Sequence, residues 1–280
     1  MKILHTVPEL RQWSRAARIA AKSVGLVPTM GALHAGHASL IQAAAASCDE
    51  VAVSIFVNPT QFGPNEDYSR YPRTFDADCQ LAEAAGATAV FAPPVEELYP
   101  CGALTYVEVE DLSSRLDGSS RPGHFRGVAT VVAKLLIAAE ADRAFFGQKD
   151  AAQVAVLRRM TTDLLLGTEL IVCPIVRESN GLALSSRNSY LSVTERDQAL
   201  VLSRAVQRVQ ALFRAGKRSS DGLIAAAEEI LASESVIRID YVELVDWTTL
   251  EPLECAVPGS LFAVAAWVGK TRLIDNAILV

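Results

Sequence analysis

The chain has 280 residues, 50% of them hydrophobic and 21% charged, which is enough apolar surface for a large buried core and excludes disorder of the whole chain. Its formal net charge of −6 gives no bulk attraction to nucleic acid or anionic lipid, although a local basic pocket for a phosphate is compatible with it. The five cysteines form no C-x-x-C pair, no apolar run reaches membrane-spanning length and no secretion signal is evident, so we expect a cytoplasmic protein with reduced thiols.

Short apolar runs alternate with longer alanine-rich segments over the first two thirds of the chain. The short runs have the composition of strands buried on both faces, and the longer segments have that of helices. In chain order they predict strand 24–28, helix 36–47, strand 51–57, helix 74–85, strand 89–92, helix 127–140, strand 144–147, helix 151–166 and strand 169–176. This alternation predicts an α/β fold with a doubly wound parallel sheet.

The pattern changes after residue 176. In chain order the remainder predicts helix 194–215, helix 220–233, strand 236–245, strand 261–268 and strand 272–278. Thr194, followed by Asp197, is the expected start of the first of these helices. We therefore expect two domains, with the doubly wound sheet in residues 1–175 and a smaller α+β domain in residues 176–280.

The loop at residues 28–37, PTMGALHAGH, joins a predicted strand to the helix that follows. It lies at the carboxyl end of a parallel strand, where α/β sheets bind ligands, and the helix N-terminus offers free backbone N–H groups to a phosphate. His34 and His37 are one helical turn apart, so both imidazoles can donate to phosphoryl oxygens as charge builds in a transition state. The G-K-[ST] ending of a Walker A loop is absent, and a zinc site or two ordinary surface histidines are the alternatives.

Two later polar segments also lie near predicted strand ends. Lys149, in the segment FGQKD, lies between a short strand and a helix and can meet a phosphate as a point charge. Ser185, Ser186 and Arg187 lie between the two predicted domains, and hydroxyls with one guanidinium suit a triphosphate. Each segment alone is typical of an ordinary polar loop, but the three together indicate a nucleotide site.

Six motifs occur in order along the chain: PTMGALHAGH, SIFVNPTQF, YPRTFDADC, SRPGHFRGVATVVAKL, FGQKD and GLALSSRNSYL. Together they resemble the pantoate–β-alanine ligase family. The resemblance implies a Rossmann-like nucleotidyl-transferase domain, a C-terminal lid domain and a homodimer. It also implies a two-step reaction, in which ATP and pantoate give pantoyl adenylate and pyrophosphate, and β-alanine then gives pantothenate and AMP. Mg²⁺ is expected with the ATP phosphates.

The resemblance also assigns site residues. Residues expected to contact ATP are Met30, Gly31, Ala32, Leu33, His34, Ala35, Gly36, His37, Gly147, Gln148, Lys149, Asp150, Val176, Leu184, Ser185, Ser186 and Arg187. Those expected to act in catalysis are His37, as the proton donor, with His34, Lys149 and Arg187. Gln61 and Gln153 are expected to bind pantoate and β-alanine, and no protein ligand is assigned to Mg²⁺.

Some polar residues near these motifs have two interpretations. Arg121, His124 and Arg126 suit either a bound pantoate or phosphate, or structural ion pairs. Asn58 lies near the expected pocket or caps a strand end. Asp76 and Asp78 either assist Mg²⁺ or β-alanine, or belong to a solvated helix start.

Three alanines depart from the family pattern. Ala35 replaces an acidic residue and is expected to point away from the chemistry, and Ala151 and Ala152 replace an aromatic residue and a glutamine beside the pantoate pocket. Two other functions therefore stay open: an HxGH nucleotidyltransferase with a different acceptor, and a degenerate homologue that binds nucleotide without catalysis. Gln61 and Gln153 argue against the first.

Overall fold

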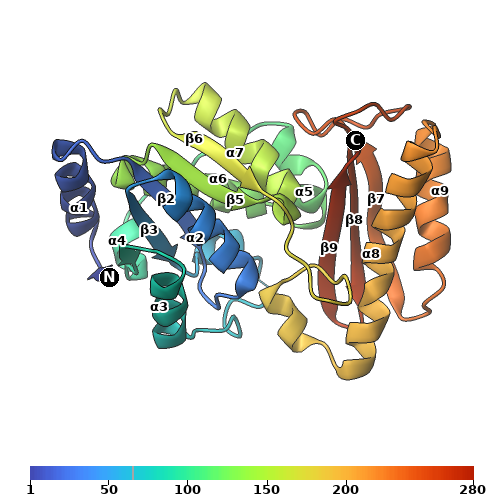
Figure 1. Cartoon of the computed structure of the whole chain (residues 1–280), viewed down its shortest axis with the longest axis horizontal. Helices are drawn as coiled ribbons and strands as arrows, with labels where there is room; N and C mark the ends of the chain where they lie inside the picture. The colour runs from blue at the N-terminus through green and yellow to red at the C-terminus, as the bar shows by residue number, and fades with distance from the viewer. Residues whose placement is uncertain (65) are drawn as a thin grey trace.

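Six parallel strands form the larger of two sheets in the computed structural model, which describes residues 1–64 and 66–280 (Figure 1). The strand order is β1-β4-β3-β2-β5-β6. Their bounds are β1 (Lys2–Leu4), β2 (Val24–Thr29), β3 (Glu50–Ile55), β4 (Ala89–Phe91), β5 (Arg143–Gly147) and β6 (Glu169–Cys173). The order reverses between β2 and β5, which pair directly, so the doubly wound prediction is confirmed.

Helices cover both faces of this sheet. Leu26 of β2 packs toward α1 (Val7–Ile19), α6 (His124–Ala139) and α7 (Ala151–Asp163). Its neighbour Val27 packs on the other face, toward α2 (Ala35–Ser47) and α3 (Phe75–Ala84). Because successive strand residues point to opposite faces, a strand covered on both sides must be apolar at every position, and this explains the continuous apolar runs.

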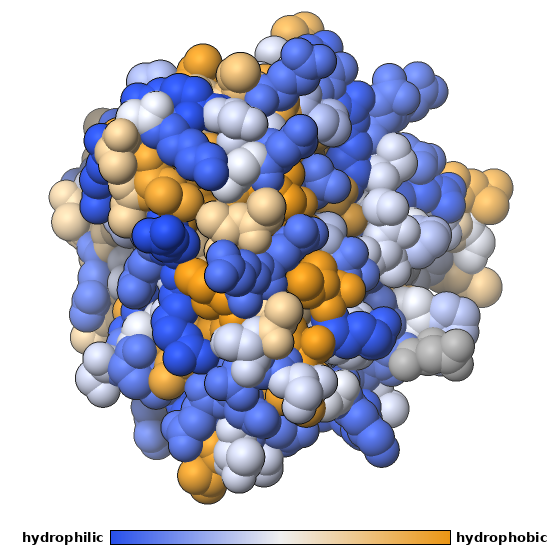
Figure 2. Space-filling view, turned by 90° about the vertical axis from the view of Figure 1, so that its right-hand side faces the viewer, coloured by the Kyte–Doolittle hydropathy of each residue, from blue (hydrophilic) through white to orange (hydrophobic). Residues whose placement is uncertain are grey.

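A second, antiparallel sheet lies in the C-terminal part, with strand order β7-β8-β9. Its strands are β7 (Ile237–Val245), β8 (Leu261–Val268) and β9 (Thr271–Ile278). The helices α8 (Val193–Arg214) and α9 (Ser220–Leu231) cover one face of it (Figure 1). The outward side of this part is mostly hydrophilic, with hydrophobic residues in scattered groups (Figure 2).

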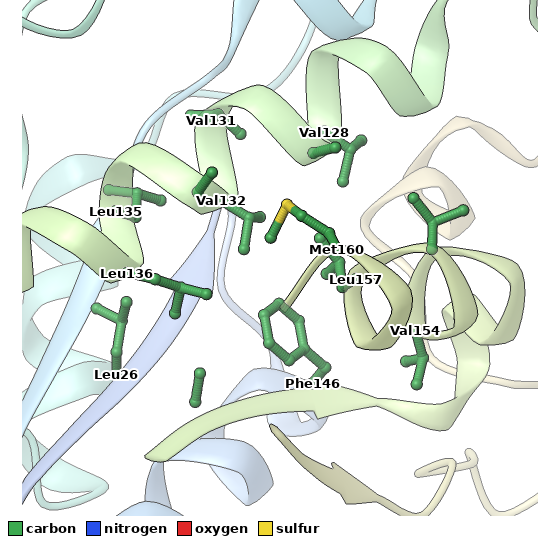
Figure 3. Close-up of a cluster of buried hydrophobic side chains, with 14 of the residues drawn as sticks. Leu26, Val128, Val131, Val132, Leu135, Leu136, Phe146, Val154, Leu157 and Met160 are labelled. Carbon is green, nitrogen blue, oxygen red and sulfur yellow. The ribbon is translucent and has the colours of Figure 1, made fainter. Parts of the chain in front are cut away.

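The two parts share a buried core. Leu261 and Ala263 of β8, with Val245 of β7, belong to the same apolar cluster as α6 and α7. One region of that cluster brings together side chains of α6, α7, β2 and β5, among them Leu136, Met160, Leu26 and Phe146 (Figure 3). Phe146 is the penultimate residue of β5, so the core holds the strand end from which the site is built.

Several boundaries differ from the sequence prediction. Strand β6 ends at Cys173 because Pro174 has no N–H to continue the ladder. Helix α8 is capped by Ser192, whose side chain and that of Glu195 form a capping box, so the expected start at Thr194 with Asp197 is wrong. Helix α6 begins at His124, one turn earlier than predicted.

The prediction missed several short or polar elements. Strand β1 is only three residues long, and α1 is an amphipathic helix that begins with a capping box of Thr6 and Glu9. The remaining short helices are α4 (Val95–Leu98), α5 (Asp117–Ser120), η1 (Pro59–Gln61), η2 (Leu112–Ser114), η3 (Gln148–Asp150) and η4 (Ser186–Tyr190). Among the described residues, no helix combines the length and the apolar character needed to cross a membrane.

The shared core makes a direct prediction for neighbouring residues of α6. Leu136 is 2% exposed and Ile137 is 53% exposed. Leu136→Ala should lower the free energy of unfolding by about 2–5 kcal/mol, because it leaves a cavity in the core. Ile137→Ala, the matched control, should change it by about 0.5 kcal/mol or less. Equal effects in denaturant titrations would contradict this placement of the core.

Candidate active site

A cavity of about 220 Å³ opens at the edge where β2 and β5 end. The loops after these two strands leave toward opposite faces of the sheet, which is the usual place for a ligand in a doubly wound fold. Predicted residues that line the cavity are Met30, His34, Gly36, His37, Gln61, Gly147, Lys149, Asp150, Gln153, Val176, Leu184, Ser185, Ser186 and Arg187. The predicted residues Gly31, Ala32, Leu33, Ala35 and Gln148 do not line it.

The first turn of α2 is capped by the two histidines. The His34 Nδ1 accepts from the Gly36 N–H at 3.1 Å, and the His37 Nδ1 accepts from the His34 N–H at 3.2 Å. The ring centroids are 4.1 Å apart. Gly36 permits this arrangement, because a Cβ there would lie 2.9 Å from the His34 Cε1.

The capping bonds determine where each histidine carries its proton. Because both Nδ1 atoms accept, a neutral ring must carry its hydrogen on Nε2. Within residues 1–64 and 66–280 neither Nε2 has a protein partner. Burial, with the nearby His34 and Lys149, lowers the pKa of His37 to about 3. Burial and then Lys149 also lower the pKa of His34, so both rings are neutral N–H donors at pH 7.

Asp78 binds the backbone of the loop that precedes α2. It is buried in the first turn of α3, and its two carboxylate oxygens accept from the N–H groups of Ala32 at 3.0 Å and Leu33 at 2.8 Å. Ala32 has φ of 50°, a left-handed conformation that is costly for a residue with a Cβ. Asp78 therefore positions the loop, and because it is buried, the alternative of a solvated helix start is wrong for this residue.

Three cationic side chains at the cavity are each paired with a carboxylate. The Lys149 Nζ lies 3.0 Å from the Asp150 Oδ1. The Arg187 Nε and Nη2 donate to the two carboxylate oxygens of Asp67 at 3.2 and 3.1 Å. Burial opposes the ionisation of Asp67, but the hydrogen bonds and charge of Arg187 keep the pKa of Asp67 below its usual value.

Arg121 forms the third pair and is oriented by His124. Its guanidinium donates to Glu66 at 2.8 and 2.6 Å. The His124 Nδ1 lies 2.8 Å from the Gln61 carbonyl oxygen, which can only accept, so the His124 Nε2 is free to accept from Arg121 at 3.0 Å. Burial and then the Arg121 charge lower the pKa of His124 to about 4. Arg121 thus forms an ion pair with Glu66, and both Arg121 and His124 line the cavity.

The Gln61 side chain is oriented by its neighbours. Its Oε1 accepts from the Asn58 Nδ2 at 3.0 Å, which turns its Nε2 toward the Met30 sulfur at 3.0 Å. The Asn58 Nδ2 also donates to the Gly127 carbonyl oxygen at 3.1 Å. Helix α6 approaches here so closely that a Cβ on Gly127 would lie 2.4 Å from the Thr60 carbonyl oxygen. Asn58 is therefore a positioning residue within the site, which the sequence left undecided.

The three alanines Ala35, Ala151 and Ala152 do not line the cavity. Ala35 is exposed, outside the cavity lining. Ala151 and Ala152 are 4% and 2% exposed and belong to the shared core, where Trp247 Nε1 donates to the Ala151 carbonyl oxygen at 3.4 Å. The backbone at this point is thus held by the C-terminal part.

Comparison with known proteins gives a consistent result. The family model described as pantoate-beta-alanine ligase matches residues 2–278. A curated pantothenate synthetase from Acidobacterium capsulatum is 62% identical over 92% of this chain and 86% of its own length. One from Koribacter versatilis is 54% identical over 100% of this chain and 96% of its own length.

Two solved structures show the same fold. A pantothenate synthetase from Thermus thermophilus matches with a TM-score of 0.93 and 45% identity, over 99% of each chain. A pantoate-beta-alanine ligase from Francisella tularensis, complexed with beta-gamma ATP and beta-alanine, matches with a TM-score of 0.81 and 33% identity, over 99% of this chain and 97% of that one.

The buried neutral histidine predicts a pH-dependent stability. The unfolded chain takes up a proton at His37 near pH 6.5, whereas the folded chain does so only near pH 3, so stability is lost as pH falls from 6.5 toward 3. Between pH 7 and 5 this loss is about 2 kcal/mol at most. His37→Gln should reduce it in denaturant titrations, and His5→Gln, at an exposed histidine, should not. The same pH dependence in all three proteins would contradict the assignment.

The two hydrogen bonds of Asp78 to the loop predict that its substitution lowers both stability and activity. Asp78→Asn replaces one acceptor by an N–H group that faces a backbone N–H, so it should cost about 1–3 kcal/mol of stability and lower activity. Asp76→Asn changes the same charge in the same helical turn at an exposed position, and should cost less than about 1 kcal/mol. Calorimetry and ligase assays of both variants test this, and similar losses would show that Asp78 acts only through the helix dipole.

Proposed function

The chain belongs to the pantoate-beta-alanine ligase family, and from that premise we propose how its site performs the reaction. The enzyme condenses pantoate with β-alanine through pantoyl adenylate, releasing pyrophosphate and AMP. One observation carries the assignment of roles: two neutral histidine donors, a lysine, an arginine and two glutamines line one cavity.

ATP is proposed to place its phosphates at the N-terminus of α2. In the first step a pantoate carboxylate oxygen attacks the α-phosphorus, and the bond to the pyrophosphate oxygen breaks. The Nε2–H groups of His34 and His37, the Lys149 ammonium and the positive end of the helix stabilise the charge that builds on the phosphoryl oxygens. Because His37 is neutral before ATP binds, we assign it as a hydrogen-bond donor and not as a source of a proton.

Arg187 is proposed to exchange partners when ATP binds. Its guanidinium is held by Asp67, and Ser186 lies 3.3 Å from the Tyr71 hydroxyl, so the η4 segment is docked on residues 67–71. A triphosphate carries more charge than one carboxylate and competes for the guanidinium. Ser185, which caps η4 by accepting from the Arg187 N–H at 3.3 Å, remains available to the phosphates. Val176 is proposed to contact adenine through its backbone.

Pantoate is proposed to lie between Gln61 and Gln153. It carries a carboxylate, two hydroxyls and a branched hydrocarbon, and an amide both donates and accepts. The apolar residues Val131 and Val132 of α6 line the same cavity and suit the hydrocarbon part. In the second step the amine of β-alanine attacks the acyl carbon, and AMP leaves. Holding amine and adenylate close while excluding water is sufficient for this step.

Mg²⁺ is proposed to accompany the ATP phosphates, whose negative charge it neutralises when bound. No group of three or more His, Cys, Asp or Glu suited to a metal occurs among the described residues, which also leaves His34 and His37 without a third zinc ligand there. A Mg²⁺ ion held mainly by phosphates and water needs only one or two carboxylates. Asp150 lines the cavity and is ionised: burial opposes this, but the Lys149 charge keeps its pKa below the usual value.

A homodimer, a cytoplasmic location and the division into domains 1–175 and 176–280 are also proposed, on the family resemblance and the two sheets. Sedimentation velocity at micromolar concentration tests the homodimer, and a monomeric mass would remove that part of the proposal. Limited proteolysis tests the division, since cleavage near residue 176 is expected if the two parts unfold separately.

The experiment for the reaction measures pyrophosphate and AMP release from ATP. Pantoate alone should give about one pyrophosphate per site with slow further turnover, and β-alanine should then start sustained AMP release. His37→Ala should slow pyrophosphate release about 10²–10³-fold with unchanged circular dichroism. Release that ignores pantoate would favour a nucleotidyltransferase, and a wild-type rate in His37→Ala would refute the role of that donor.

A further inference from the structure

The last strand of the chain contacts the lysine segment of the site. Asn276, on β9, is 3% exposed although its side chain is polar. Its Nδ2 donates to the carbonyl oxygens of Gln148 at 3.0 Å and Lys149 at 2.9 Å, and its Oδ1 accepts from the Gln148 Nε2 at 3.1 Å. Backbone carbonyls only accept, so the two N–H bonds of the amide must face them.

These bonds fix the direction of the Lys149 side chain. The Gln148 carbonyl belongs to the peptide before the Lys149 Cα, and the Lys149 carbonyl belongs to the peptide after it. Orienting both peptides fixes φ and ψ of Lys149, and with them the direction of its Cα–Cβ bond. One amide from the C-terminal part thus aims a cation that lines the cavity.

The preceding residue, Asp275, contacts the segment that leads to Ser185, Ser186 and Arg187. Asp275, 3% exposed, forms a two-point ion pair with Arg177 at 2.7 and 2.8 Å, and its Oδ1 also accepts from the Asn276 N–H at 2.8 Å. Arg177 in turn donates to the Gly181 carbonyl oxygen at 3.1 Å, within the turn that leads from Val176 to the serine–arginine segment. Two consecutive residues of β9 therefore contact two segments of the site. Asn276 contacts the segment with Lys149, and Asp275 contacts the segment that leads to Arg187.

We propose that Asn276 is a positioning residue for adenylation, which holds Lys149 in the direction required to meet the ATP phosphates. This rests on the phosphate-binding role of Lys149 in the proposed function. Asn276 acts through the backbone and not on the substrate. A donor amide is required, because aspartate has no N–H group and would place a negative charge against two carbonyl oxygens.

The test compares Asn276→Ala, Asn276→Ser and a matched control. Single-turnover pyrophosphate release should slow about 10- to 100-fold in Asn276→Ala, since a displacement near 1 Å of a catalytic group has that effect. Asn276→Ser keeps one donor and should show a smaller loss. Trp247→Phe removes another bond from the C-terminal part to a backbone carbonyl, that of Ala151, without touching Lys149, and should stay near the wild-type rate.

A double-mutant cycle separates positioning from general structural support. In a Lys149→Met background, Asn276→Ala should slow adenylation by less than about threefold, because the side chain it positions is absent. The second step, started with preformed pantoyl adenylate and β-alanine, should also change by less than about threefold. Three outcomes would overturn the proposal. The first is additive effects of the two substitutions on the adenylation rate, and the second is an equal slowing of both steps. The third is a wild-type adenylation rate in Asn276→Ala. If Asn276→Ala does not fold, the same comparisons with Asn276→Ser decide the question.

A second readout keeps this test independent of the reaction. Affinity for a non-hydrolysable ATP analogue, measured by calorimetry, should fall in Asn276→Ala and show the same non-additivity with Lys149→Met. If the wild-type chain binds the analogue but releases no pantoate-dependent pyrophosphate, the proposed reaction is wrong. The double-mutant cycle on analogue affinity then still decides the role of Asn276. Additive effects on affinity would overturn the positioning.

Discussion

The reciprocal capping of α2 by His34 and His37 is the interaction on which the site depends. The helices α1 and α8 begin with the usual combination of a hydroxyl and a glutamate, as in Ser192 and Glu195. Helix α2 has the same reciprocal geometry with two neutral imidazoles. A glutamate at this position would repel a phosphate, whereas the imidazole caps the helix and still presents an N–H donor. The helix terminus thus remains attractive to an anion.

The cations of the site are paired with carboxylates, which is how an acidic protein can carry a cluster of basic side chains at one cavity. Lys149, Arg187 and Arg121 each face a carboxylate, so the cavity holds its cations without leaving a buried charge uncompensated. In the proposed function a triphosphate competes with Asp67 for Arg187, so its binding energy would include the cost of separating that ion pair.

The C-terminal part contributes to the site through its packing. Its strands share a core with α6 and α7, and β9 reaches the segments on both sides of the cavity through Asp275 and Asn276. Both segments are consequently held from two directions, by the parallel sheet that precedes them and by the antiparallel sheet that packs across them.

The amino-acid sequence by itself determined β2 to β6 of the parallel sheet and the residues that gather at their ends. Strands buried on both faces must be continuously apolar, and His34, His37 and Lys149 lie within a few residues of strands that end at the same edge. The three-residue β1 left too short a pattern to recognise, and the capping box of Thr6 and Glu9 at α1 was an available signal that was not used.

Only the tertiary structure decided which groups hold the site together. Asp78 reaches a loop more than 40 residues earlier in the chain, and Asn276 reaches one more than 120 residues earlier. Side chains of these types also occur as ordinary polar residues at helix starts and in strands. A hydrogen bond needs its partner within about 3 Å and in the right direction, and for residues so far apart in the chain that is settled only when the elements pack.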